Sequence, residues 1–239
     1  MSVWTGTMAA AALALGTRAD DDAITFTDIA TDTRALRGGE LFVALAGEKH
    51  DAHGYLAQAA AAGARGAVVQ RLSDDAPASL HYYIVSDTLA ALGRLARFRR
   101  YRLGARVCAI TGTNGKTTTK ELLRAVLATR YRTHATAGNF NNLVGAPLTL
   151  LAAPDDVEVI IAELGTNAPG EIARLAAIVE PDAAIITGIA PGHLEGLGDL
   201  DGILREKTSL LAWLPAGAPA IVADQPESLP LRARALHRA

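Results

Sequence analysis

A glycine-rich run at residues 110–119 is the feature that most restricts the fold of this chain. It reads Ile-Thr-Gly-Thr-Asn-Gly-Lys-Thr-Thr-Thr, follows the apolar stretch 107–110 and precedes apolar residues at helical spacing. Small residues let backbone N–H groups face phosphate oxygens, a lysine reaches the outer phosphates, and a hydroxyl can bind Mg²⁺. The run therefore predicts a strand, a nucleotide-binding phosphate loop and a helix, with contacts from Gly112, Thr113, Asn114, Gly115, Lys116, Thr117 and Thr118.

One glycine departs from the usual form of such loops. The common pattern has a glycine where this chain has Ile110, and a glycine lies instead at Gly112. The alternative interpretation is an ordinary glycine-rich turn. The flanking strand and helix patterns favour a variant phosphate loop.

Strand and helix patterns alternate after residue 105. Strands are expected at 107–111, 131–135, 157–163, 183–189 and 220–222, with helices at 116–129, 143–151, 170–179 and 200–213. Such alternation predicts an α/β fold with a parallel sheet, which binds ligands at the carboxyl ends of its strands.

Polar residues follow four of these predicted strands and should therefore meet at one edge of the sheet. The first group is the phosphate loop, and the others are Asn139, Asn141 and Asn142, then Glu163, Thr166 and Asn167, then His193 and Glu195.

Each of these residues also has a purely structural interpretation. Glu163 can hold Mg²⁺ beside Thr117, or cap a helix or form a salt bridge. His193 can be a ligand or a structural histidine. The asparagines suit a simple turn as well as a substrate contact. Lys207, on its local pattern alone, is expected to be a surface lysine.

The first hundred residues predict a smaller α/β domain. Strands at 40–45 and 66–70 flank a helix at 55–63, and residues 8–15 predict a packed N-terminal helix. A helix at 89–101 ends near Gly104, which places the domain boundary between 1–104 and 105–239. Five arginines there are expected to form a solvated helix face rather than a binding patch: Arg94, Arg97, Arg99, Arg100 and Arg102.

Charge and cysteine content exclude several classes of protein. The net charge of -2 is spread along the chain, so no surface for nucleic acid or an anionic membrane is expected. The early apolar stretch has no preceding basic residue and is too short to span a bilayer, so no membrane insertion is expected. The single cysteine, Cys108, is expected to be a buried thiol, which fits a reducing cytoplasm.

Several motifs, in order along nearly the whole chain, resemble those of the Mur ligases. They are Asp32-Thr33-Arg34, residues 39–45 with Gly47-Glu48, residues 111–119, residues 138–142 with 145–149, residues 163–167 and residues 187–196.

The resemblance implies an ATP-dependent amide ligase of peptidoglycan synthesis. Its substrates would be UDP-N-acetylmuramoyl-tripeptide, whose terminal carboxylate is phosphorylated, and D-alanyl-D-alanine, whose amine then attacks. Lys116, Lys207 and His193 would be catalytic. Thr117 and Glu163 would hold one Mg²⁺, and His193 with a carbamylated Lys207 a second; Lys120 and Lys49 are less favoured for that role than Lys207.

The resemblance also assigns the substrate contacts. Domain 1–104 would bind the UDP-sugar, and domain 105–239 would bind ATP. Ala52 stands where the family usually has a glycine before His53, which weakens any contact of that loop with phosphate. The implied substrate residues are Asp32, Thr33, Arg34, Gly47 and His53; Asn139, Asn141 and Asn142 are added to them from their position after a predicted strand.

Members of the family continue into a longer ATP domain and a third domain, so the chain is expected to be a truncated ligase that is inactive alone. A different hypothesis is a non-catalytic module that binds nucleotide or UDP-sugar and acts with a partner chain. A third is a folylpolyglutamate synthetase, which shares the ATP loop but is disfavoured by residues 139–142 and 192–196.

Overall fold

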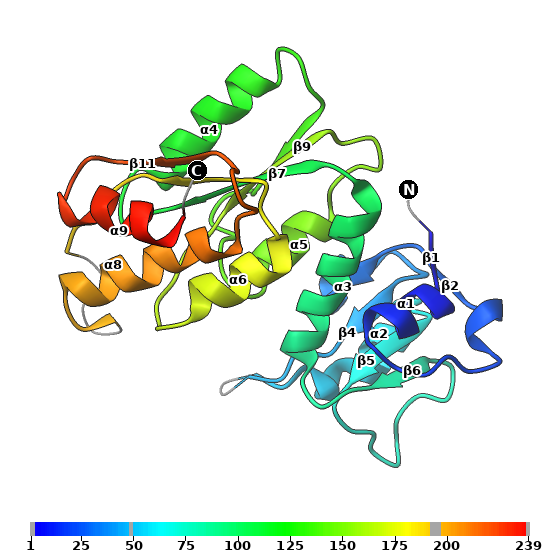
Figure 1. Ribbon diagram of the computed structural model, residues 1–239. Helices are drawn as coiled ribbons and strands as arrows, with labels where there is room; N and C mark the ends of the chain where they lie inside the picture. The colour runs from blue at the N-terminus through cyan, green and yellow to red at the C-terminus, as the bar shows by residue number, and fades with distance from the viewer. Residues whose placement is uncertain (1–2, 48–49, 192–196, 238–239) are drawn as a thin grey trace. The chain divides into compact units, whose positions relative to one another are not determined.

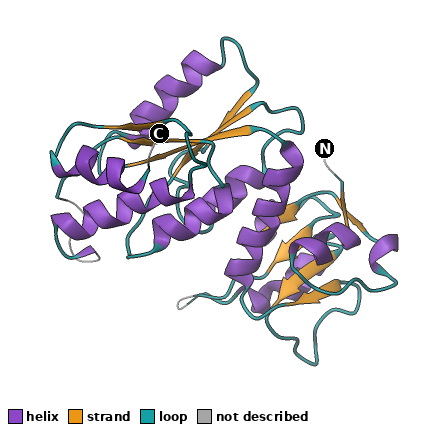
Figure 2. Cartoon of the chain, viewed as in Figure 1, coloured by secondary structure: helices purple, strands orange, loops and turns teal. Residues whose placement is uncertain are grey.

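The computed structural model describes residues 3–47, 50–191 and 197–237. The chain divides into two compact units, Met1–Phe98 and Arg99–Ala239. Each unit contains a parallel sheet and helices, so the α/β class expected from the sequence is confirmed (Figure 2). No helix of the described residues has the length and apolarity that a membrane span requires.

The second unit is built on a five-stranded parallel sheet. The order is β11 (Ala220–Val222), β10 (Ala183–Ile186), β7 (Arg106–Thr111), β9 (Val159–Glu163) and β8 (Thr133–Ala135). In chain order, the central strand β7 is followed by the edge strand β8 and by β9, which lies between β7 and β8. The chain then crosses to the other side of β7 to form β10 and β11, so the strand order reverses beside β7. Open α/β sheets bind ligands at such a reversal.

Helices cover both faces of this sheet (Figure 1). Among the helices of the described residues, α4 (Lys116–Leu127) packs on one face, against β7, β8 and β9. Val107, Ala109 and Ile160 are almost fully buried, as expected for strands covered on both sides. The other face carries α5 (Gly145–Leu151), α6 (Glu171–Val179), α8 (Leu200–Thr208) with its continuation η4 (Ser209–Trp213), and α9 (Ser228–Leu236).

The first unit contains a four-stranded parallel sheet. Alternate residues of the strand at 41–43 face opposite sides of this sheet. Phe42 packs against Leu56 and Ala59, while Leu41 and Val43 are buried on the other face. The strands at 29–30 and 81–84 were not predicted from the sequence. The order is β3 (Ile29–Ala30), β4 (Leu41–Val43), β5 (Gly66–Val69) and β6 (His81–Ile84).

Short elements complete the first unit. A two-stranded antiparallel pair joins β1 (Trp4–Thr5) to β2 (Thr25–Phe26). The α-helices are α1 (Gly6–Ala12) and α2 (Leu56–Ala61), and the 3₁₀ turns are η1 (Asp21–Ala23), η2 (Thr33–Ala35) and η3 (Ala52–Tyr55). The longer helix α3 (Thr88–Leu103) begins in the first unit and ends in the second.

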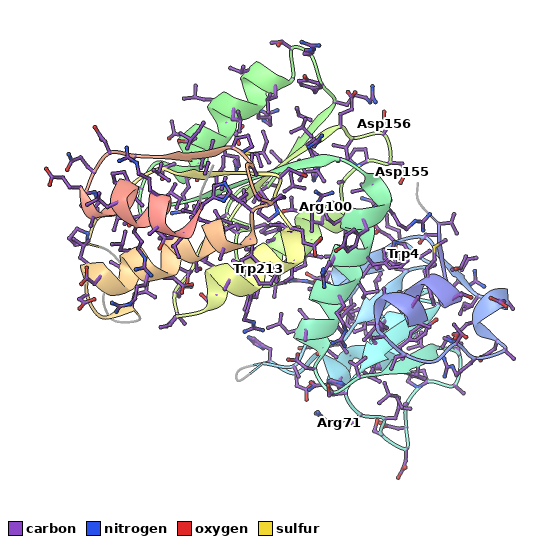
Figure 3. The ribbon with its side chains drawn as sticks, viewed as in Figure 1. Trp4, Arg71, Arg100, Asp155, Asp156 and Trp213 are labelled. Carbon is purple, nitrogen blue, oxygen red and sulfur yellow. The ribbon has the colours of Figure 1, made fainter. Side chains whose placement is uncertain are left out.

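The solvated arginine face predicted on the helix at 89–101 is wrong for Arg99 and Arg100. Arg99 is 5 % exposed, donates to the carbonyl of Ala153 at 2.7 Å and pairs with Asp155 at 2.7 Å. Arg100 pairs with Asp182 at 2.8 Å (Figure 3 labels Arg100 and Asp155). Carbonyls and carboxylates of the second unit lie along the end of α3, which compensates both charges. The division between the units accordingly falls inside α3, before Gly104.

Replacing Arg99 by methionine is expected to lower the free energy of unfolding by roughly 1–3 kcal/mol, because a buried carbonyl and a carboxylate lose their donor. Urea unfolding measures the change. Arg124→Met is the matched control, since Arg124 is an exposed helical arginine paired with Glu121. Equal losses in the two variants would contradict a special role for the buried contacts.

Candidate active site

The backbone of the glycine-rich run offers donors to an anion. Gly112 has φ +141° and Gly115 has φ +79°, both in the region that favours glycine. Gly115 also stands immediately before α4. The first N–H groups of a helix lack intrahelical partners, and the helix dipole makes this end positive. The loop therefore has the conformation and the polarity that phosphate binding requires.

Lys116, the first residue of α4, lies over this loop. Its ammonium donates to the carbonyls of Gly112 at 2.9 Å and Thr113 at 3.0 Å. Burial lowers the pKa of Lys116, and the nearby carboxylate of Glu163 opposes that shift. The side chain is thus a half-buried cation at the mouth of the phosphate loop.

Glu163 ends β9 and is 2 % exposed. Thr117 Oγ1 donates to its Oε2 at 3.0 Å, and Asn141 Nδ2 donates to its Oε1 at 2.9 Å. The ammonium of Lys120 lies 3.9 Å from Oε2. Hydroxyl and carboxylate oxygens therefore lie side by side, and both are ligand types that Mg²⁺ prefers.

Lys120 lies in a different environment from Lys116, which faces the loop, and from Lys207, which lines a cavity. It is 1 % exposed, and its ammonium donates to the carbonyl of Thr136 at 2.7 Å and pairs with Glu121 at 3.3 Å. The bond to Thr136, directly after β8, holds α4 against the end of that strand. Lys120 does not belong to the cavity lining described next.

A cavity of about 120 Å³ opens at the carboxyl edge of the sheet, and Lys207 of α8 is part of its wall. Lys207 is 3 % exposed, so its interpretation as a surface lysine is wrong. The helix packs this residue inward, and burial, with Lys116 nearby, lowers the pKa of Lys207 to about 8 against the opposing effect of Glu206 and Glu171. The lining residues are Lys116, Asn141, Asn142, Gly165, Thr166, Asn167, Glu171 and Lys207.

Two carboxylates that the sequence analysis missed fix one wall of this cavity. Glu206 accepts from the backbone N–H groups of Gly170 and Ile172, both at 2.7 Å. Glu171 accepts from the N–H of Asn167 at 2.7 Å, and although burial raises its pKa, this donor and its neighbours bring the pKa below its usual value. An acid in the first helical turn was a usable signal for Glu171.

The three predicted asparagines have different surroundings. Asn141 contacts Glu163, as described above. Asn142 lines the cavity, yet its Oδ1 also accepts from the N–H groups of Val144 at 3.1 Å and Gly145 at 2.8 Å, which starts α5. Asn139 is exposed and accepts from the N–H of Asn141 through its backbone at 2.7 Å. The segment therefore forms a turn and also contributes Asn141 and Asn142 to the site.

Gly165→Ala is expected to push the Asn141 amide away from Glu163. An added Cβ would stand 2.7 Å from Asn141 Oδ1, closer than carbon and oxygen pack. We expect a loss of about 1–3 kcal/mol in the free energy of unfolding, the scale of one hydrogen bond to a charged group. In a double-mutant cycle with Asn141→Ala, the two losses should not add. Full additivity would contradict this, and Gly16→Ala, which meets open space, is the control.

Predicted substrate residues of the first unit lie at the carboxyl edge of its own sheet. Asp32, Thr33 and Arg34 follow β3, and Asp32 Oδ2 lies 2.6 Å from Arg34 Nη2. The hydrogen bonds from Arg34 lower the pKa of Asp32 to about 2. Arg34 is 84 % exposed in its side chain, so its guanidinium remains accessible to a ligand.

His53 and Gly47 follow β4 at the same edge. His53 Nδ1 lies 2.6 Å from Asp51 Oδ1, and its Nε2 accepts from the N–H of Gln70 at 2.8 Å. Both ring nitrogens are therefore bonded within the unit. The N–H of Gly47 donates to the carbonyl of His50 at 2.9 Å.

His193, predicted as a catalytic residue and a metal ligand, lies outside the described residues, as does Glu195. Thr118 is exposed on α4.

The comparison with protein families decides the class of this chain. The model of the Mur ligase middle domain matches residues 110–238. The chain belongs to the Mur ligase family. It is 43 % identical over 199 residues to UDP-N-acetylmuramoyl-tripeptide–D-alanyl-D-alanine ligase of Bacillus subtilis, covering 83 % of this chain and 44 % of the relative.

Solved Mur ligases have a similar structure. The crystal structure of MurF from Acinetobacter baumannii matches with a TM-score of 0.89 and 34 % identity, over 99 % of this chain and 52 % of that one. MurF from Thermotoga maritima, in complex with ADP, matches with a TM-score of 0.81 and 27 % identity, over 88 % of this chain and 48 % of that one. The chain thus spans about half the length of the relatives it matches.

Proposed function

We propose that the whole protein joins D-alanyl-D-alanine to UDP-N-acetylmuramoyl-tripeptide at the expense of ATP. The name of the Bacillus subtilis relative supports this substrate pair. The observation that carries the proposal is the meeting of Lys116, the Thr117–Glu163 pair and Lys207 at one sheet edge, beside a loop built for phosphate.

In the proposed reaction, the terminal carboxylate oxygen of the tripeptide takes the γ-phosphoryl group of ATP, and ADP leaves. The amine of D-alanyl-D-alanine then attacks the carbonyl carbon, phosphate leaves, and the nitrogen loses a proton. The loop N–H groups hold the phosphates, and the Lys116 ammonium offsets charge that builds on the transferred group.

Thr117 and Glu163 fit a Mg²⁺ ion. Their oxygens lie 3.0 Å apart, and the other carboxylate oxygen of Glu163 accepts from Asn141. Bound there beside phosphates, the ion would supply further charge neutralisation.

We also propose that Lys207 is carbamylated, which would give a second Mg²⁺ an anionic oxygen ligand together with His193. Its amine nitrogen would attack the carbon of CO₂ and lose a proton, which requires the neutral amine. Burial at the cavity and a pKa lowered to about 8 support this chemistry. With ¹³C-bicarbonate, NMR should show a carbamate carbon that Lys207→Met lacks; its persistence in that variant would refute the assignment.

The first unit is proposed to bind the UDP-sugar, and the second to bind ATP. The exposed Arg34 at the carboxyl edge of the first sheet supports a contact with the anionic substrate. Arg34→Met should raise the dissociation constant of the UDP-substrate and leave that of Mg·ADP unchanged. Calorimetry with each ligand separates these effects, and a change confined to ADP would contradict the assignment.

Product formation by the full-length protein tests the reaction. Mass spectrometry should detect UDP-N-acetylmuramoyl-pentapeptide only when ATP, Mg²⁺, the tripeptide and D-alanyl-D-alanine are all present. ATP consumption with glutamate and a folate instead would indicate the folylpolyglutamate reaction.

A binding module that acts with a partner chain is the second candidate, since the phosphate loop and the exposed Arg34 can serve ligand binding without turnover. It predicts that the 239-residue chain binds Mg·ADP and the UDP-tripeptide but forms product only after a chain with the remaining part is added. Turnover by the 239-residue chain alone would exclude it.

A further inference from the structure

Thr187, directly after β10, makes close contact with the phosphate loop. Its hydroxyl donates to the carbonyl of Asn114 at 2.6 Å and lies 3.3 Å from the carbonyl of Thr111. The same hydroxyl occupies the space that a Cβ on Gly112 would need. The glycine at 112 is therefore required twice, by its φ of +141° and by the approach of Thr187.

Thr113 joins the loop to the same segment. Its N–H donates to the carbonyl of Gly188 at 2.9 Å. Its hydroxyl donates to the carbonyl of Ala190 at 3.2 Å and accepts from the N–H of Ala190 at 3.1 Å. Both polar groups of Thr113 that could reach a phosphate are thus committed to residues 187–190.

The bond from Thr187 also sets the direction of the next donor. In a planar trans peptide, the carbonyl oxygen and the following N–H point in opposite directions. When the Asn114 carbonyl faces Thr187, the N–H of Gly115 must face away from Thr187. The hydroxyl of Thr187 thereby orients a donor that a phosphate can use.

We propose that Thr187 is a positioning residue that holds the phosphate loop in its anion-binding conformation, and that Thr113 anchors the loop instead of binding phosphate through its side chain. This inference rests on the proposed nucleotide site. It adds residues 187–190 to that site as the support of the loop.

Three variants of the full chain test the inference. Thr187→Val keeps the shape and removes the hydroxyl, whereas Thr187→Ser keeps the hydroxyl. Thr149→Val is the matched control, because Thr149 is buried and its hydroxyl also donates to a backbone carbonyl, that of Gly145 at 3.1 Å.

Amide hydrogen exchange of Thr113 and Ala190 gives a readout that needs no ligand. Thr187→Val should speed their exchange at least about tenfold, Thr187→Ser should restore it within about twofold, and Thr149→Val should leave it unchanged. Unchanged exchange in Thr187→Val, or an equal increase in Thr149→Val, would overturn the proposal.

Calorimetry with Mg·ADP gives the second readout. Thr187→Val should raise the dissociation constant about tenfold more than Thr149→Val does, even where both variants unfold at the same temperature, and Thr187→Ser should recover most of the affinity. Equal affinities in the two valine variants would also overturn it. If the unchanged chain binds no Mg·ADP, the proposed nucleotide site fails, while hydrogen exchange still decides whether Thr187 positions the loop.

Discussion

The Lys116→Met variant should bind Mg·ADP roughly 100-fold more weakly than the unchanged chain. A hydrogen bond from a charged donor contributes about 1.5–3 kcal/mol, and the upper end of this range corresponds to a factor of about 100. Lys116 qualifies for the upper end because it is half-buried beside the loop. Isothermal titration calorimetry measures the dissociation constants directly.

Lys116→Met should change the free energy of unfolding only slightly, because among the described residues the Lys116 ammonium bonds only to backbone carbonyls. Its ammonium donates to the carbonyls of Gly112 and Thr113, and Thr113 is only partly buried, so a water molecule can replace the ammonium there. Arg124→Met, which removes an exposed cation from the same helix, should leave ADP affinity unchanged. Equal losses in the two variants would mean that the helix acts only through its overall charge.

The elements around the loop could be predicted because their signals are local. Apolar stretches mark the central strands, glycines and a lysine mark the turn, and helical spacing marks α4. The cluster of Glu163 and Asn141 then follows from the rule that parallel strands end at one edge.

Features that depend on distant partners could not be predicted. Nothing near Arg99 shows that the Ala153 carbonyl and Asp155 will surround it. Lys207 follows a helical pattern typical of a surface, and only the packing of α8 buries it. The glycine shifted to position 112 was likewise ambiguous, because the side chain that excludes a Cβ there is Thr187, far along the chain.

The Lys207→Met variant should be more stable than the unchanged chain at pH 7, by up to roughly 3 kcal/mol. The pKa of Lys207 falls from 10.5 to about 8 on folding, and one pKa unit corresponds to about 1.4 kcal/mol. Below pH 8 both states carry the proton, so the folded chain bears the full cost of a buried ammonium. Between pH 8 and 10.5 the unfolded chain binds more protons, so stability rises with pH. The advantage of methionine should therefore narrow across this window.

Urea unfolding in CO₂-free buffer from pH 7 to 9.5 measures this difference. Lys120→Met is a control with the opposite sign, because the Lys120 ammonium has carbonyl and carboxylate partners and its loss should cost about 1–3 kcal/mol. Adding bicarbonate should then stabilise the unchanged chain and Lys120→Met, which keep Lys207, and should not stabilise Lys207→Met. A carbamate on Lys207 would replace two neighbouring cations by a pair of opposite charges with Lys116. If Lys207→Met instead lowers the free energy of unfolding in CO₂-free buffer at pH 7, the Lys207 ammonium has stabilising partners in the folded chain. Burial would then not favour the neutral amine, and the proposed carbamylation would lose its support.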